Sequence, residues 1–294
     1  MSKPVVRSLD FLTSLGMIVH LIDGTYELFR QFYGMLRFAK AQDKPFGAVV
    51  GVLNGVLKMV EDGARHLGVA TDHMIESFRN ELWSGYKTGD GIDPLLFGQF
   101  HPLEEALHSM GIVVWPMIEL EADDALASAA SIAAKDPRVG KISIWSPDKD
   151  LAQCVQGDRI VQVDARNKVI RNADAVRAKF GVAPELIPDY LALVGDSADG
   201  YPGIKGIGAK GAANLLNRYG PIESFPSTVL TETRDLALLF KKLATLRTDA
   251  NLFSGVDALE WQGPRQDFAD TATRLGSQSL IARAEKARRL VGSM

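Results

Sequence analysis

Apolar residues in the first 175 positions form short runs that alternate with stretches of helical spacing. The runs lie at 17–22, 67–71, 111–120 and 141–146, and a weaker pair flanks a turn within 159–170. Between these runs, apolar residues recur every three or four positions, as amphipathic helices require. Strands that alternate with helices are typical of a mostly parallel sheet with flanking helices, so an α/β fold is predicted for this segment.

The pattern changes near residue 175. From there on, helical segments are separated by glycine and proline. We therefore predict a leader at 1–16, an α/β core at 17–175 and a helical domain at 176–294. No apolar run reaches the roughly 18 residues that span a bilayer, and polar residues interrupt the start of the chain where a signal peptide would be apolar. A cytoplasmic location is expected.

Acidic residues follow the predicted strands at four places. They are Asp23, Asp72, Glu121 with Asp123 and Asp124, and Asp148 with Asp150. Open α/β sheets bind ligands at the carboxyl ends of their strands, so these seven side chains are expected to share one crevice. Taken singly, such acids also suit the first turn of a helix, but that alternative does not explain the whole set.

Seven carboxylates in one crevice imply bound cations, because they could not all stay ionised without compensating charge. Oxygen donors without cysteine or histidine suit Mg²⁺ or Mn²⁺. Since one Mg²⁺ takes only one or two carboxylates, two ions about 4 Å apart are favoured, the arrangement that clamps a phosphodiester.

A second acidic pair, Asp196 and Asp199, precedes a glycine-rich segment at 201–216 instead of following a strand. The segment contains G-x-G-x-x-G, but without a preceding strand a dinucleotide site is disfavoured. A glycine hairpin between two helices fits better, because its backbone N–H groups would hold a phosphate without reading the base. The positions concerned are Lys205, Gly206, Gly208, Lys210 and Gly211. A plain loop before a capped helix remains the alternative.

Composition adds two constraints. The net charge of −3 argues at first against a nucleic-acid partner, but if the acids surround metal ions the remaining surface is basic, and distribution matters more than the total. The single cysteine, Cys154, excludes an internal disulfide and a cysteine-based zinc site. The histidines at 20, 66, 73, 101 and 108 show no ligand spacing and are attributed to packing or surface.

Several segments together resemble the bacterial 5′-nuclease (5′–3′ exonuclease/flap endonuclease) family, which includes the amino-terminal nuclease domain of DNA polymerase I. They are "LIDG", "FRNELWSGYK", "ELEADDALA", "SPDKDLAQ", "PDYLALVGDSADGYPGIKGIGAKGAANLL" and "KKLATLRTD". The blocks occur in family order, and the one at 188–216 is the most specific. The resemblance implies a PIN-like nuclease core, a helix–hairpin–helix motif at about 185–216, and Mg²⁺-dependent cleavage of DNA at 5′ ends and 5′ flaps. Repair or removal of RNA primers would be its role, and a monomer is expected.

The resemblance also implies site residues. Asp196 and Asp199 would join the seven acids as metal ligands, and Arg79 and Lys87 would act with Asp148 and Asp150 in catalysis. Tyr86 is expected either to stack on a base or to pack in the core. The hairpin would bind DNA through Lys205, Gly206, Gly208 and Lys210. A potassium ion would be held there by main-chain oxygens of Leu193, Val194, Pro202, Ile204 and Ile207.

Two departures from the family pattern stand out. Asp90 occupies the arginine position of the family's Y-K-x-x-R, and no lysine or arginine occurs at 88–108, where relatives carry a basic arch. The second departure is the leader at 1–16. Two other functions remain open: a catalytically inactive module that binds branched DNA, and a PIN-like ribonuclease. The complete acidic set disfavours the first, and the glycine hairpin disfavours the second.

Overall fold

A six-stranded sheet forms the centre of the protein. The computed structural model describes residues 16–36 and 45–291, so residues 1–15 of the predicted leader lie outside the described part. The strands are β1 (Met17–Asp23), β2 (His66–Asp72), β3 (Val113–Met117), β4 (Val139–Trp145), β5 (Ile160–Asp164) and β6 (Val169–Arg171), in the order β3-β2-β1-β4-β5-β6. The first five are parallel and β6 is antiparallel. The mostly parallel sheet is confirmed.

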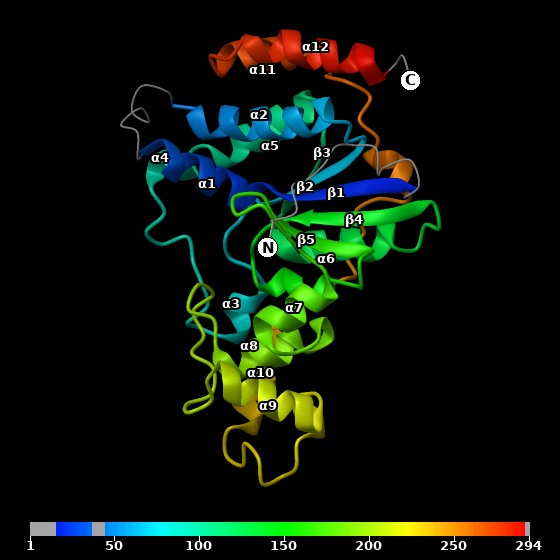
Figure 1. Ribbon diagram of the computed structural model, residues 1–294. Helices are drawn as coiled ribbons and strands as arrows, with labels where there is room; N and C mark the ends of the chain where they lie inside the picture. The colour runs from blue at the N-terminus through cyan, green and yellow to red at the C-terminus, as the bar shows by residue number, and fades with distance from the viewer. Residues whose placement is uncertain (1–15, 37–44, 292–294) are drawn as a thin grey trace, which may run out of the picture.

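Helices cover both faces of the sheet because the strands are apolar on both sides. The helices α1 (Gly24–Leu36), α2 (Gly47–Glu61) and α5 (Phe100–Ser109) lie on one face, and α6 (Ala122–Ala133) lies on the other (Figure 1). Neighbouring residues of β1 divide between the two sides: Ile22 packs in the cluster of α2 and α5, whereas Leu21 packs in the cluster of α6. This alternation follows from the two-residue repeat of a strand.

A helical layer lies beyond α6 (Figure 1). It consists of α7 (Ala173–Phe180), α8 (Ile187–Val194), α9 (Ala209–Tyr219) and α10 (Arg234–Ala244). The short α3 (Phe78–Leu82) lies beside it, and Tyr86 shares its apolar cluster with Leu193 and Phe240. The segment that links β2 to β3 therefore connects the sheet to the helical layer.

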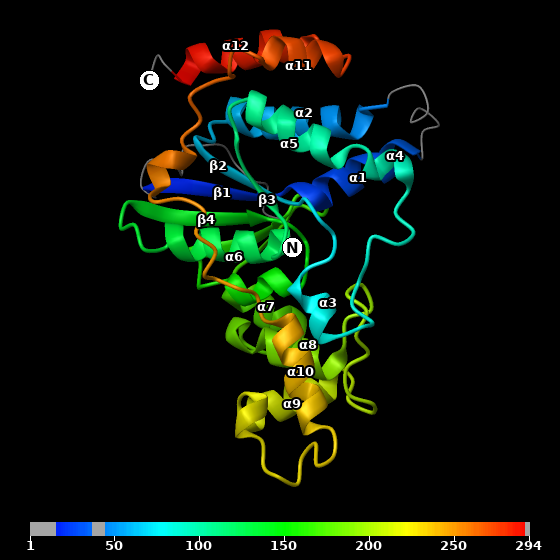
Figure 2. The same ribbon diagram turned by 180° about the vertical axis from the view of Figure 1, so that it is seen from behind.

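The last helices return to the sheet side of the molecule. After α10 the chain runs back past the sheet (Figure 2), and Trp261 donates its backbone N–H to Arg65 O at 2.8 Å. The helices α11 (Phe268–Arg274) and α12 (Ser279–Val291) then pack outside α2 and α5, where Leu280 and Ala284 join the α2 cluster. The division at 175/176 stays a prediction, and this packing places α11 and α12 with the α/β core.

No helix in the described ranges, 16–36 and 45–291, is long and apolar enough to cross a bilayer.

Candidate active site

Acidic side chains meet at the carboxyl edge of the sheet. Asp23 and Asp72 are the last residues of β1 and β2, which pair in parallel. Glu121 caps the start of α6, and Asp150 begins a short 3-10 turn after β4. The loop after α8 adds Asp196 and Asp199 from the helical layer. The acidic side chains thus lie between the sheet and that layer, and their location is called the crevice below.

One group of three acids joins the two layers. Oxygen atoms of Asp150, Asp196 and Asp199 lie within 4.8 Å of one another. Asp150 Oδ1 is buried and has no hydrogen-bond partner in the described part of the protein. Burial, and then repulsion from Asp148 and Asp199, raises the pKa of Asp150 well above its usual range, and burial raises that of Asp199 to about 6. A bound cation would give this unpaired carboxylate oxygen a partner and would offset the repulsion between the acids.

A second group lies over the ends of β1 and β4. Burial raises the pKa of Asp23 to about 7, although Tyr26 N–H and Ser146 Oγ–H donate to it at 2.8 and 2.9 Å. The pKa of Asp123 is also raised well above its usual value, by burial and by the charges of Asp148 and Asp23. Asp148 itself is exposed. This all-oxygen donor set fits hard divalent ions.

Lys87 is one cation among these acids. Its Nζ lies 2.7 Å from Glu121 Oε2 and 3.1 Å from Asp199 Oδ1, and a third of its side chain stays exposed. Burial opposes the charge of both partners. Even so, Lys87 and Arg79 outweigh that effect and lower the pKa of Glu121, while Glu121 and Asp199 raise the pKa of Lys87. The pair is therefore charged, and Lys87 is accessible from solvent.

Arg79 and Asp124 form a buried pair behind this crevice. The Arg79 guanidinium donates to both carboxylate oxygens of Asp124 at 2.7 Å, to Glu121 Oε1 at 3.0 Å, and to the backbone oxygens of Leu243 and Thr245 at 2.8 and 3.3 Å. Arg79 is 1% exposed and Asp124 is 0% exposed. Asp124 also accepts from the backbone N–H groups of Glu121 and Arg247. Both oxygens of Asp124 are thus engaged, and Arg79 cannot reach a phosphate in this conformation.

Tyr86 packs in the core instead of presenting a face to solvent. It is 3% exposed and belongs to the apolar cluster of the helical layer. Its hydroxyl donates to Glu121 Oε2 at 3.3 Å. Of the two roles expected for Tyr86, base stacking has no open ring face here, and packing describes what the side chain does.

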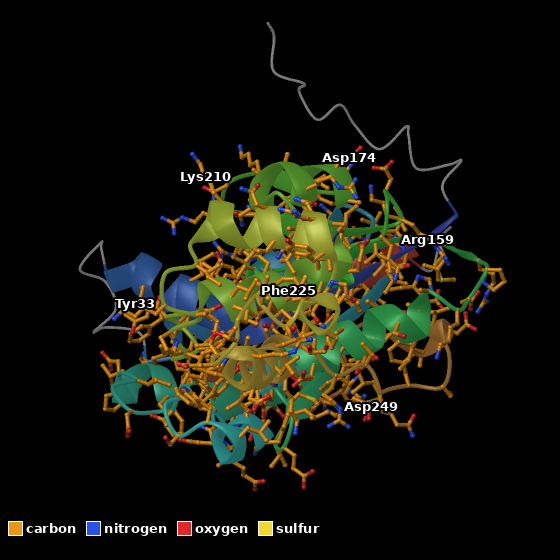
Figure 3. The ribbon with its side chains drawn as sticks, turned by 90° about the horizontal axis from the view of Figure 1, so that it is seen from below. Tyr33, Arg159, Asp174, Lys210, Phe225 and Asp249 are labelled. Carbon is orange, nitrogen blue, oxygen red and sulfur yellow. The ribbon has the colours of Figure 1, made fainter. Side chains whose placement is uncertain are left out.

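The glycine hairpin is open to solvent. Lys205, Gly206, Gly208 and Lys210 are exposed, and Lys210 extends from the outer surface at the helical end (Figure 3). Gly206 has φ 88°, which favours glycine, and α9 begins at Ala209 without a side-chain cap. The first N–H groups of α9 are therefore available to an anion.

The predicted potassium positions lie where two backbones nearly touch. A Cβ on Gly195 would lie 2.5 Å from Pro202 C, and one on Gly203 would lie 2.4 Å from Val194 C. Leu193 O accepts from Ile204 N at 2.8 Å, and Ile204 O accepts from Ile207 N at 3.0 Å. Only glycine permits this close approach of the two segments.

Two further polar residues of this region contact the acids, and the sequence pattern did not predict them. Lys149 Nζ pairs with Asp196 Oδ2 at 2.7 Å, and Ser77 Oγ donates to Glu121 Oε1 at 2.7 Å. Lys149 lies between two of the predicted acids, which was a usable signal. His73 and His101, which were attributed to packing or surface, have nitrogens within 4.8 Å of a Glu104 oxygen.

The segment that replaces the basic arch is short and partly apolar. Asp90 is exposed, and α4 (Pro94–Phe97) begins four residues later. Leu95 and Phe97 on α4 are 62% and 50% exposed. The described segment after Lys87 therefore offers no lysine or arginine to a nucleic acid until past α5.

Free thiol chemistry is not supported. Cys154 is a free cysteine. Desolvation, followed by the charges of Asp123 and Asp124, raises the pKa of its thiol, so the thiolate nucleophile is disfavoured.

Two family models match the chain in order. The 5′-3′ exonuclease N-terminal resolvase-like domain matches residues 18–181, and the 5′-3′ exonuclease C-terminal SAM fold matches residues 182–267. The first alone covers more than half of the chain.

Curated relatives include both short exonucleases and polymerases. A 5′-3′ exonuclease of Buchnera aphidicola subsp. Baizongia pistaciae is 34% identical over 251 residues, covering 79% of this chain and 82% of the relative. One of Aquifex aeolicus is 32% identical over 264 residues, covering 84% and 87%. DNA polymerase I of Pseudomonas aeruginosa is 34% identical over 269 residues, which cover 84% of this chain but 29% of the polymerase.

Solved structures share the fold at low sequence identity. T5 5′-exonuclease with bound zinc matches with a TM-score of 0.62 and 19% identity, covering 92% of this chain and 98% of that one. The catalytic core of Rad2 in complex with DNA substrate matches with a TM-score of 0.61 and 15% identity, covering 93% of each. Both likenesses support the fold alone. The two consecutive family matches and the relatives at 32–34% identity confirm the resemblance seen in the sequence: this chain belongs to the 5′-3′ exonuclease family.

Proposed function

We propose that this protein is a Mg²⁺-dependent nuclease that hydrolyses phosphodiester bonds at 5′ ends and 5′ flaps of DNA, in repair or primer removal. The observation that carries the proposal is the group Asp150, Asp196 and Asp199, with its partnerless buried oxygen. It lies in one crevice with Asp23, Asp123 and Asp148. Bound cations would stabilise such a concentration of carboxylates, whose pKa values are raised by burial and by one another.

Two ions would be held by different parts of the crevice. Glu121, Asp123, Asp148 and Asp150 would mainly hold the tighter ion, and Asp196 and Asp199 would lean toward the second. Ions about 4 Å apart would polarise the phosphate and supply an activated water. Mn²⁺ is expected to substitute for Mg²⁺ because it prefers the same oxygen donors. Asp72 accepts Ala122 N–H at 2.8 Å, which fixes its carboxylate at the edge of the site.

Lys87 is the residue we assign to the phosphate. Its ammonium is charged, partly exposed and bound to two carboxylates of the crevice. Once cations neutralise those carboxylates, Lys87 can donate to a non-bridging phosphate oxygen and stabilise charge that develops during cleavage. Arg79 instead acts as a positioning residue, because it holds Glu121 and Asp124 and has no free donor directed to the crevice.

The hairpin is proposed to hold the duplex. Backbone N–H groups at the start of α9, with Lys205 and Lys210, would bind phosphates regardless of sequence. The close backbones at Gly195 and Gly203 support a K⁺ ion bound by main-chain oxygens of Leu193, Val194, Pro202, Ile204 and Ile207. The proposal also includes a monomer in the cytoplasm, which gel filtration and cell fractionation would test.

The decisive experiment is a cleavage assay with 5′-labelled flap, nicked and single-stranded DNA, in Mg²⁺, Mn²⁺ or EDTA. Metal-dependent release of short 5′ fragments at the flap junction is expected, and a flap with a 5′ ribonucleotide segment tests primer removal. Asp150→Asn should abolish cleavage, whereas Asp174→Asn, at an exposed acid on α7 (Figure 3), should not change it.

Two outcomes would replace the proposal with one of its rivals. Intact binding to branched DNA without cleavage in either metal would identify a non-catalytic module. Cleavage of RNA but not of DNA flaps would identify a PIN-like ribonuclease.

A further inference from the structure

A group of imidazole and carboxylate donors lies outside the acidic crevice. It consists of His73, His101 and Glu104, whose donor atoms lie within 4.8 Å of one another. His73 directly follows β2, and His101 and Glu104 lie in α5 three positions apart. Side chains at i and i+3 of a helix share one face, so α5 presents both donors toward the end of β2.

The group lies on the opposite side of the β2 end from the crevice. Thr71 donates its hydroxyl to Glu104 Oε1 at 2.8 Å, and His73 Nδ1 lies 2.8 Å from Glu104 Oε2. Asp72, between them, accepts from Ala122 at the start of α6. Because alternate residues of a strand face opposite sides, the group and the crevice share the backbone of this strand end but no side chain.

We propose that His73, His101 and Glu104 bind one transition-metal ion, with Zn²⁺ as the ion best suited to them. Two imidazole nitrogens and one carboxylate oxygen are zinc ligands, and three protein ligands leave a fourth position for water. Zinc donors lie roughly 3.3 Å apart, given bonds of about 2.0–2.1 Å and tetrahedral angles, so small side-chain rotations within the observed 4.8 Å suffice. Mg²⁺ prefers oxygen ligands and is not expected here.

The position of Thr71 favours a ligand role for Glu104. Its hydroxyl occupies Oε1 of Glu104, and this leaves Oε2 directed at His73. Ligating carboxylates in metal sites are commonly oriented by such an outer hydrogen bond. Glu104 is also 9% exposed, so its charge requires a partner.

A hydrogen bond between His73 and Glu104 alone is the competing explanation. It accounts for one imidazole but not for His101, whose ring centroid lies 4.2 Å from that of His73. The structure records no hydrogen bond to the His101 ring from any residue in 16–36 or 45–291. A bound ion accounts for all three side chains, and it would tie the end of β2 to α5.

The test reads metal binding and not cleavage, so its result is independent of the proposed nuclease activity. Zn²⁺ is titrated into metal-free protein by chelator competition, in an excess of Mg²⁺ that occupies the oxygen-only crevice. His101→Ala is the test variant, and His108→Ala is its control, because both side chains are exposed on the same helix. Thermal melts without zinc establish that both variants fold.

Wild type and His108→Ala should each bind one Zn²⁺ with similar affinity. His101→Ala should bind zinc at least about 100-fold more weakly, because loss of an outer-shell partner alone lowers metal affinity about 10–100-fold. In ¹⁵N spectra of the histidine rings, two of the five imidazoles should shift with zinc, and assignment should identify them as His73 and His101. Equal zinc affinity in wild type and His101→Ala would overturn the proposal, as would zinc-induced shifts confined to other histidines.

Discussion

Replacing Arg79 with methionine tests whether this residue positions the site or contacts the phosphate. The change removes five hydrogen bonds that Arg79 donates. It leaves the Asp124 carboxylate, 0% exposed, without a counter-charge. Breaking a buried ion pair from one side costs about 3–5 kcal/mol. For a chain of this size each kcal/mol lowers Tm by roughly 2 °C, so a fall of about 6–10 °C is expected.

The assay is thermal unfolding in excess Mg²⁺, with the double variant Arg79→Met/Asp124→Asn as the matched control. Asparagine leaves no unpaired charge at position 124, and its side-chain oxygen can still accept from the backbone N–H groups of Glu121 and Arg247. The double variant should therefore recover part of the lost Tm. Arg79→Lys should not restore it, because lysine lacks the planar pair of donors that binds both oxygens.

The reasoning fails if Arg79→Met melts within about 2 °C of wild type while cleavage is lost. That result would mean that the guanidinium leaves Asp124 at little cost and reaches the phosphate. A loss of Tm that Asp124→Asn does not relieve would equally contradict the pairing, since the two changes would then be independent.

Three further predictions concern charge. Asp148→Asn should abolish cleavage and leave the Kd for DNA within a few-fold; retained cleavage would contradict the metal assignment. In EDTA, Tm should fall between pH 5 and 7. Asp23 and Asp199 have pKa values of about 7 and 6 in the folded state, so the stability that their protonated forms contribute is lost as pH rises. A Tm that rises over this range would contradict this expectation. Lys205→Ala/Lys210→Ala should lower the salt slope of DNA binding by about 1.8 at unchanged Tm; an unchanged slope would place the duplex elsewhere.

The location of the acidic crevice was predictable from local sequence. Apolar runs ending in Asp23 and Asp72, and runs followed by Glu121 and Asp148, identify strands with acids at their carboxyl ends. Parallel strands bring those ends to one edge whatever the details of packing. The match to family blocks extended this to Asp196 and Asp199, which follow no strand.

Tertiary structure decided what each polar side chain does there. Nothing local distinguishes Arg79 from Lys87, yet one is 1% exposed and the other has a third of its side chain in solvent. The difference arises because backbone oxygens of Leu243 and Thr245, far along the chain, close over the Arg79 guanidinium. Burial of Tyr86 has the same origin, in contacts with the helical layer.

Long-range packing also set two features that sequence spacing did not reveal. The helices α11 and α12 have apolar faces that could pack against any apolar surface. Only the three-dimensional fold shows that these faces pack against α2 and α5. His73 and His101 are 28 positions apart in the sequence, and they meet because α5 packs beside the end of β2. Sequence determined which chemistry the chain carries, and tertiary contacts determined which groups share a site, because burial and proximity depend on segments that are distant in the chain.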